Sequence, residues 1–383
     1  MRTQVFAILV SLVAGGAHAT EPRNVAIIVH EGVELLDFAG PGEVFSSAGN
    51  GAAFRVFTVG PTLAAVVSQG FVRITPDYSI ANSPKPDILV IPGGRTTMLY
   101  NDPKMMAWLR DRVGAAEVTM SVCTGAIALA RAGLLDGLHA TTHYGALASL
   151  RKFPHVTVDA DARFVDNGRI ITTQGVSAGI DGALHVVERL LGSEAAWSDA
   201  RYMMYHWEPA SLTVAERDEL RPYVEQDWTK VAAVYRKKLD ANGKDADAAR
   251  RLGIAETELH DYAHAVVTLE RAVSLGIKDP DVLDELGDSQ AALGHFREAA
   301  RAYERELPLR SSLAQPFVAV NAAKAWTRAG DKQAAITILS RYAAKLDRAS
   351  LRELGAVPEL ASLRGDARFD ALVREPSTAT ANP

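Results

Sequence analysis

Cysteine is almost absent from this chain: Cys123 is the only one among 383 residues. A single cysteine excludes an internal disulfide. Cys123 is therefore either a small buried hydrophobe, a reactive thiol, or a bridge between two chains. The strand-to-helix turn predicted below at this position is poorly suited to a bridge.

Long apolar runs and basic clusters are also missing. After the first twenty residues no segment reaches the roughly 20 apolar residues that a membrane-spanning helix needs. The formal net charge is −5 and no basic run occurs, so the sequence has no basic patch that would bind the phosphates of a nucleic acid. Nucleotide-binding glycine fingerprints and metal-ligand spacings are absent as well. We therefore expect no cofactor, no metal and no nucleic-acid partner.

The first residues have the pattern of an export signal. Arg2 precedes an apolar run at residues 5–16, and Ala17-His18-Ala19 fits a cleavage site. The run is too short to span a bilayer. We expect residues 1–19 to be a signal peptide and the mature protein to be periplasmic or secreted, with no membrane association after cleavage. The alternative is a signal anchor that stays uncleaved.

Between residues 23 and 192, short β-rich runs alternate with helical runs, which predicts an α/β sandwich with a mostly parallel sheet. Asn167-Gly168 predicts the turn of a hairpin. Strands are predicted at residues 25–30, 54–60, 72–76, 87–92, 139–142, 164–166 and 169–173, and a further short strand is predicted to end at Cys123. Helices are predicted at residues 35–48, 103–115, 144–152 and 176–191.

After Gly192 the strand signals stop. Thr213 and Glu216 have the spacing of a capping box, which predicts that a helix begins near Thr213. Helical patterns continue to about residue 374. We therefore divide the chain into an α/β domain at residues 23–210, a helical domain at 211–374 and a disordered tail at 375–383. Breaks between helices are predicted at residues 242–243, 276–280 and 308–316.

The helical part contains an internal repeat. Gly253 and Gly287 are 34 residues apart, and so are Leu269 and Tyr303. The same spacing relates Leu252 to Leu286, Tyr262 to Phe296 and Ala265 to Ala299. This period resembles the tetratricopeptide repeat, in which small residues admit the neighbouring helix and large ones fill the gap. A leading half-repeat fits residues 227–239 and a third unit residues 321–344.

Such repeats usually bind partners. We expect residues 228–374 to bind a protein or peptide, or instead to roof a pocket of the first domain. The alternative is an ordinary helical bundle whose spacing is accidental.

A short β-branched stretch, predicted as a strand, ends at Cys123, and an alanine-rich helical run starts right after it. The free N–H groups and the dipole of that helix favour a thiolate. The alternative is a cysteine packed as a small hydrophobe.

Five motifs in the first half occur together: residues 32–41, Ile91-Pro92-Gly93-Gly94, Ser121-Val122-Cys123-Thr124-Gly125-Ala126, Ala140-Thr141-Thr142-His143 and residues 168–183. In these motifs, residues 24–192 resemble the ThiJ/PfpI superfamily. The similarity is greatest to the branch with isonitrile hydratases and the sensor-like domains of AraC-type regulators. The resemblance implies a class I glutamine amidotransferase-like, flavodoxin-like fold.

The resemblance also implies site roles. Cys123 would be the nucleophile and Asp37 its acidic partner, protonated near neutral pH when the sulfur is a thiolate. The alternative for Asp37 is a helix N-terminal cap before Gly40-Pro41. Gly93 and Gly94, with the Thr124 amide, would form an oxyanion hole, and the Thr124 hydroxyl would donate to the substrate.

Two further residues complete the predicted pocket. His143 is expected to form a wall of the site first and to act as a base second. Ser177 is expected to line the pocket and has the sequence position of a helix cap.

The function that follows is a cofactor-free, cysteine-dependent hydratase or lyase of the isonitrile hydratase type, acting on a small electrophile. The alternative is a non-catalytic small-molecule or redox sensor that signals through the repeats. Peptidase activity ranks last, because no Cys-His-acid triad is evident. A homodimer is a further expectation, taken from the superfamily.

Overall fold

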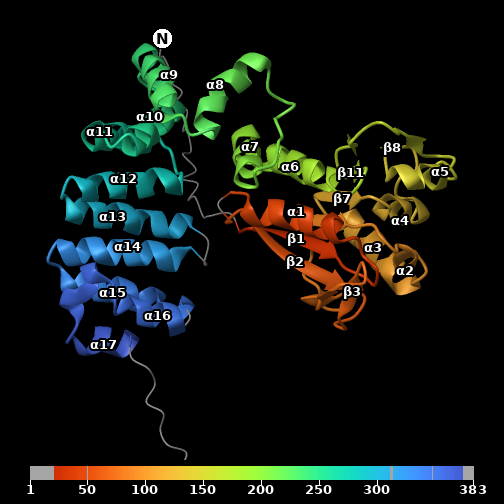
Figure 1. The fold of residues 1–383 in the computed structure, drawn as a ribbon, viewed down its shortest axis with the longest axis horizontal. Helices are drawn as coiled ribbons and strands as arrows, with labels where there is room; N and C mark the ends of the chain where they lie inside the picture. Colours follow the sequence, from red (N-terminus) through yellow and green to blue (C-terminus); the bar gives the residue numbers. More distant parts are fainter. Residues whose placement is uncertain (1–20, 50, 311–313, 347, 374–383) are drawn as a thin grey trace, which may run out of the picture.

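The computed structural model describes residues 21–373 apart from residues 50, 311–313 and 347. An α/β region is followed by an all-helical region that stands beside it (Figure 1). The expected signal peptide and disordered tail lie outside the described residues. Among the described helices, none has the length and apolarity to cross a membrane.

The main sheet is parallel except for its β10–β11 hairpin, as the sequence predicted. Val25 to Ile28 of β1 and Ile88 to Ile91 of β6 are buried on both faces, which is typical of the inner strands of such a sheet. The strand order is β10 (Phe164–Asp166), β11 (Ile170–Thr173), β7 (Val118–Val122), β6 (Ile88–Ile91), β1 (Arg23–Ile28), β2 (Phe54–Gly60) and β5 (Tyr78–Ser79).

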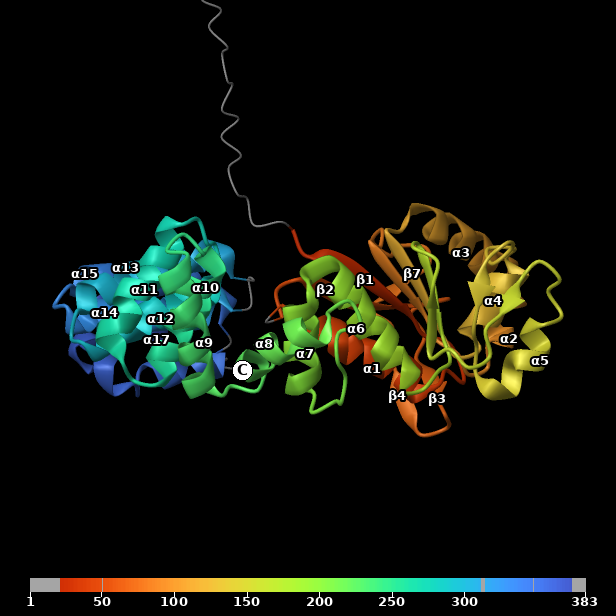
Figure 2. The ribbon, with the colours of Figure 1, turned by 90° about the horizontal axis from the view of Figure 1, so that it is seen from above.

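Helices cover both faces of the sheet (Figure 2). Alternate residues of β1 point to opposite sides: Val25 packs with Val44 and Leu184, whereas Ile28 packs with Leu109. One layer contains α1 (Leu35–Ser47), α6 (Ala178–Leu191) and α7 (Ser193–Tyr202). The other contains α2 (Thr97–Tyr100), α3 (Pro103–Ala115) and α4 (Gly125–Arg131).

Some short elements differ from the predictions. The strands predicted at residues 72–76 and 139–142 are shorter and lie outside the main sheet, where β4 (Val72–Ile74) pairs with β3 (Val66–Ser68) and β8 (His139–Ala140) pairs with β9 (Thr157–Val158). The helix predicted at 144–152 is divided into η1 (Tyr144–Ala146) and α5 (Leu147–Leu150). These runs are too short for local propensity to determine their partners.

The second region is built of successive antiparallel helices. Its first helix, α8, begins directly after Thr213, and the capping box is formed: Thr213 Oγ1 accepts from the Glu216 amide, and the Glu216 carboxylate accepts from the Thr213 amide at 2.8 Å. The helices are α8 (Val214–Val224), α9 (Trp228–Ala241), α10 (Ala246–Glu258), α11 (Tyr262–Ser274), α12 (Pro280–Ala292), α13 (Phe296–Glu306), α14 (Gln315–Arg328), α15 (Lys332–Tyr342), α16 (Arg348–Leu354) and α17 (Ala367–Val373). Short 3₁₀ turns, η2 (Leu307–Leu309), η3 (Ala343–Lys345) and η4 (Pro358–Leu363), connect the later helices.

The two repeat glycines are points of close helix packing. A β-carbon at Gly253 of α10 would lie 2.6 Å from the Leu269 side chain of α11. One at Gly287 of α12 would lie 2.5 Å from the Tyr303 ring of α13. The positions 34 residues apart therefore have the same packing role, while membership of the tetratricopeptide class stays a prediction.

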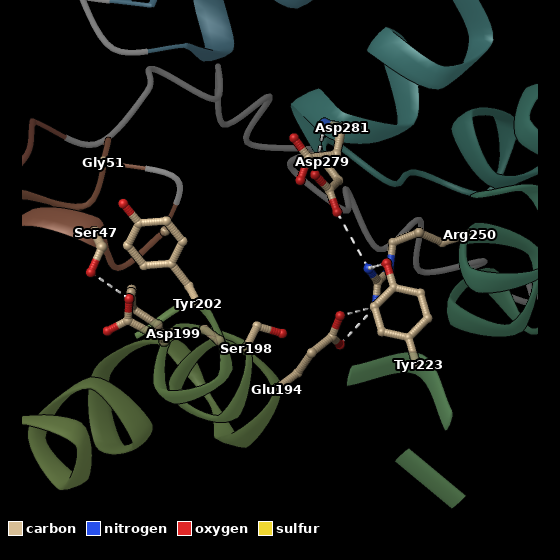
Figure 3. A pocket seen from close by; sticks show the side chains of 13 residues that line it. Ser47, Gly51, Glu194, Ser198, Asp199, Tyr202, Tyr223, Arg250, Asp279 and Asp281 are labelled. Atoms are coloured by element: carbon tan, nitrogen blue, oxygen red, sulfur yellow. Dashed lines mark hydrogen bonds and ion pairs between the residues drawn. The ribbon is translucent and has the colours of Figure 1, made fainter. Parts of the chain in front are cut away.

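A carboxylate of the first region binds two arginines of the second. Glu194 of α7 binds both Arg250, at 2.8 Å, and Arg251 of α10. Beside this contact lies an open cavity of about 660 Å³ whose walls come from both regions (Figure 3). Tyr223 of α8 stacks under Arg251, at 4.8 Å from the ring centre, and completes the junction.

We predict that Gly287→Ala lowers the unfolding free energy by about 1–3 kcal/mol, because the added methyl group would overpack against the Tyr303 ring. The matched control is Gly114→Ala in α3, where nothing lies within 4 Å of the added carbon. That substitution should stabilise the protein by up to about 1 kcal/mol. Urea unfolding followed by circular dichroism measures both. Equal effects of the two substitutions would contradict the packing argument.

Candidate active site

Cys123 is the turning point between strand β7 and helix α4. Its φ is +56°, a left-handed conformation that is uncommon for a residue with a side chain. The Thr142 hydroxyl donates to its carbonyl oxygen at 2.7 Å, and only 7% of the residue is exposed. Such a backbone persists only where the surroundings impose it, and it is typical of functional sites.

Glycines allow the neighbouring loops to approach this elbow. A β-carbon at Gly175 would lie 2.5 Å from Cys123 Cβ and 3.1 Å from its sulfur. A β-carbon at Gly93 would lie 2.7 Å from the Thr124 nitrogen and 2.8 Å from Asp37 Oδ2. The Gly93 loop, the Gly175 turn and helix α1 therefore converge on the sulfur.

Asp37 has no exposed surface, yet both carboxylate oxygens have a backbone donor. Oδ2 accepts from the Gly93 amide at 2.9 Å and Oδ1 from the Val176 amide at 2.8 Å. Val176 has φ +49°, which is strained for a β-branched residue. The N-cap interpretation of Asp37 is wrong, because helix α1 is preceded by Glu34 as its N-cap residue and Asp37 lies within its first turn.

The predicted oxyanion loop has partners inside the protein. The Gly93 amide donates to Asp37, and the Gly94 amide donates to Thr124 Oγ1 at 3.1 Å. The Thr124 hydroxyl lies 3.2 Å from the Gly94 carbonyl oxygen, to which it donates. The expectation that both glycine amides and the Thr124 hydroxyl face a substrate is therefore corrected: they hold the loop to the elbow. The Thr124 amide remains directed at the sulfur, where it lowers the pKa of Cys123.

His143 is half-buried near the elbow but does not complete a dyad. Its Nδ1 accepts from the Gly145 amide at 3.3 Å, and its ring packs 4.3 Å from that of Tyr144. Within the described ranges no hydrogen bond joins His143 to Cys123 or Asp37. The geometry gives it no contact through which to act as a base on the thiol.

Ser177 occupies the N-cap position of α6, but its side chain caps no amide. Its hydroxyl instead accepts from Arg163 at 3.3 Å. The residue follows Val176 directly, so it belongs to the turn that holds Asp37. In the described part of the chain, no three His, Cys, Asp or Glu side chains gather closely enough to hold a metal ion.

The proton state of the pair differs from the expected thiolate. Burial raises the pKa of Asp37 to about 6, although the Val176 and Gly93 amides act in the opposite direction. Burial, and next to it the charge of Asp37, raises the pKa of Cys123 to about 12. At neutral pH the pair is therefore mainly carboxylate and thiol. Helix α4 has only seven residues, and its N-terminus does not offset burial.

Two contributors were missed by the sequence reasoning. The Thr142 hydroxyl fixes the Cys123 carbonyl, and the Val176 amide fixes Asp37. Both residues lie in motifs that were noticed, beside His143 and Ser177 respectively. Nothing in the local pattern shows which neighbour in a motif makes the contact, because that depends on how distant segments meet.

A mostly parallel sheet with a cysteine at the strand-to-helix turn after a central strand defines an α/β protein with a cysteine elbow. Residues 23–189 match the DJ-1/PfpI family. The isonitrile hydratase of Pseudomonas putida is 31% identical over 174 residues, which cover 45% of this chain and 74% of that protein. The chain belongs to the DJ-1/PfpI family.

Other relatives are more distant. The HTH-type transcriptional regulator GbdR of Pseudomonas aeruginosa is 27% identical over 188 residues, which cover 48% of this chain and 51% of the regulator. A crystal structure of a ThiJ/PfpI family protein from Pseudomonas syringae has 29% identity and a TM-score of 0.45, and covers 49% of this chain and 77% of that one. The family match ends at residue 189, before the helical region begins.

We predict that the rate of Cys123 alkylation by iodoacetamide rises with pH to about 6 and then levels off until the pH approaches about 12. Between these two pKa values the pair holds one proton in total, so the fraction with thiolate and neutral Asp37 does not change with pH. Rates measured from pH 4 to 10 test this. In Asp37→Asn the plateau should vanish and the rate should keep rising. A single titration near about 8.5, as for a free cysteine, would contradict the coupling.

Proposed function

We propose that the protein hydrates a small electrophile of the isonitrile type at Cys123, with Asp37 as the proton shuttle. The observation that carries this proposal is the fully buried Asp37 carboxylate, held by two backbone amides at the cysteine elbow. The similarity to the isonitrile hydratase of Pseudomonas putida supports the substrate class.

The chemistry follows from the proton state of the pair. An isonitrile, R–N≡C, accepts both a nucleophile and a proton at its terminal carbon. Asp37 removes the thiol proton as the sulfur forms a bond to that carbon, and then returns the proton to the same carbon, which gives a thioimidate, R–N=CH–S–Cys. Water then adds to the carbon and its proton passes to nitrogen. The C–S bond breaks, the sulfur recovers a proton, and the product is the formamide R–NH–CHO.

Each step of this scheme is balanced without a redox partner. The net reaction is the addition of one water to one isonitrile. A carboxylate with a pKa of about 6 is ionised at neutral pH. Because this pKa lies near the operating pH, the group can both take up and return the proton. The high pKa of the thiol is consistent with proton transfer during attack, in place of a preformed thiolate.

We predict that the purified protein converts aryl and alkyl isonitriles into formamides, detected by the loss of the isonitrile infrared band and by mass spectrometry of the product. Cys123→Ala should abolish turnover, and Asp37→Asn should lower kcat/KM by about 10²–10⁴-fold. The control is Asp199→Asn on α7. Asp199 is another buried carboxyl whose pKa is raised to about 6, but its partner is Ser47 and it does not touch the elbow. Turnover that survives Cys123→Ala would overturn the proposal.

A sensor function is the second candidate. The relationship to a protein named as a transcriptional regulator supports it, together with a thiol that is mainly protonated at neutral pH. Under this reading, Cys123 and Asp37 bind a small molecule without turning it over. The sensor reading would be favoured if a panel of isonitriles protected Cys123 from alkylation while no formamide formed.

For the helical region we propose a repeat array that binds a protein or peptide through residues 228–374. The equivalent packing of Gly253 and Gly287 supports this reading. We further propose that the protein forms homodimers through its α/β region, an expectation taken from the family.

We also propose export to the periplasm or the exterior, on the basis of Arg2, the apolar run at 5–16 and Ala17-His18-Ala19. Expression in a Gram-negative host, followed by fractionation and intact-mass measurement, should give a periplasmic product that begins at Thr20. A full-length product in the cytoplasmic fraction would contradict this expectation.

A further inference from the structure

The segment between α7 and α8 places a tyrosine hydroxyl against the start of helix α6. Tyr205 Oη lies 3.2 Å from Asp181 Oδ1 and 3.4 Å from the Ser177 carbonyl oxygen, so its hydrogen can be donated to either. Tyr205 lies beyond residues 23–189, which match the family. The contact therefore connects the family domain to the segment that leads into the helical region.

The first turn of α6 is also held by Arg163, which lies beside Tyr205. Arg163 Nε donates to Asp181 Oδ2 at 2.6 Å, and its Nη2 donates to the Ser177 hydroxyl at 3.3 Å. Arg163 therefore donates to one carboxylate oxygen of Asp181 and to the Ser177 hydroxyl. The single hydroxyl hydrogen of Tyr205 goes either to the other oxygen of Asp181 or to the Ser177 carbonyl oxygen. Both residues are fixed by side chains that come from outside α6.

These contacts adjoin the site directly. Ser177 follows Val176, whose amide donates to Asp37 Oδ1 at 2.8 Å, and Gly175 packs on Cys123. Val176 holds φ +49°, which a valine adopts only under external restraint. Within α6 the Gly179 amide donates to the Val176 carbonyl oxygen at 3.2 Å, but the Ser177 side chain caps no amide of the helix, so the side-chain contacts to the turn come from Arg163 and Tyr205.

We propose that Tyr205 is a positioning residue: its hydroxyl fixes the turn at residues 175–177, keeps the Val176 amide on Asp37 and so directs the carboxylate toward Cys123. The catalytic consequence rests on the proposed hydration. The geometric consequence does not, because it concerns only how Asp37 is held.

The helical region has a route to this turn through the chain itself. Tyr205 lies three residues after the end of α7 at Tyr202, and its amide donates to the Ala200 carbonyl oxygen of that helix at 2.8 Å. Glu194 of α7 binds Arg250 and Arg251 of α10. A shift of α10 would act on Glu194, then on α7 and the Tyr205 hydroxyl. Occupancy of the helical region thereby has a physical means of altering the site.

The measurable consequence is the pH at which Asp37 titrates. The groups that face Asp37 are Glu34 of its own helix, the Cys123 thiol, and the Gly93 and Val176 amides. The Val176 amide lowers the pKa of Asp37, and Glu34 raises it. Weakening the amide contact therefore moves the pKa upward.

The test is Tyr205→Phe, which removes the hydroxyl and keeps the ring. The pH at which Cys123 alkylation reaches its plateau should move upward by about half a unit. The matched control is Tyr202→Phe on α7, which is 71% exposed and should leave the profile where it is. If the protein hydrates isonitriles, the acid limb of kcat/KM should move with the alkylation profile.

A second variant distinguishes a local effect on the turn from a general loss of structure. Arg163→Gln removes the other restraint on Ser177 and Asp181, and it should shift the profile in the same direction. A shift in both variants at unchanged melting temperature supports the proposal. Coincident profiles for the parent, Tyr205→Phe and Arg163→Gln would overturn it. Absence of isonitrile turnover with the shift still present would overturn only the proposed function.

Discussion

The organisation of the α/β region depends on one buried carboxylate. A charge without solvent needs hydrogen-bond donors, and Asp37 obtains them from the backbone of two segments far apart in sequence, at Gly93 and Val176. Those two contacts require that the ends of β6 and β11 and the first turn of α1 meet. They meet at the carboxyl edge of the sheet, where ligands of open α/β folds generally bind. Cys123 lies at the same edge because β7 ends between β6 and β11.

The sequence was a good guide to the elements and to which of them converge. Helix α3, strand β2 and strand β10 have the predicted limits, and β11 begins one residue later than predicted, because their apolar periodicity and turn residues are strong. Asp37, Gly93 and Cys123 also come together. The protonation of Asp37 and Cys123 and the hydrogen-bond partners of the site could not be predicted from the sequence in the same way. Whether the Gly93 amide faces a substrate or Asp37 depends on tertiary packing, and the thiolate expectation failed because burial outweighs a short helix.

The two regions are connected by polar contacts more than by a shared core. Their apolar clusters are largely separate, with Trp197, Leu220 and Val224 as a small cluster between them. Across the junction, Arg250 and Arg251 both bind Glu194. Paired charges that are largely shielded from water depend on one another. Loss of Glu194 would leave Asp247 as the carboxylate partner of Arg251, and Asp247 and Asp279 as the partners of Arg250. Polar junctions of this kind allow relative movement more readily than apolar ones.

The low exposure and raised pKa of Cys123 also affect how fast its sulfur is oxidised. Peroxides oxidise thiolates, and the reaction proceeds through sulfenic acid to irreversible acids when no second thiol is available to trap it. This chain has no second cysteine. A sulfur that is 7% exposed and mainly protonated presents little thiolate to an oxidant. The arrangement therefore gives the protein a long chemical lifetime in surroundings that would inactivate an open, ionised cysteine.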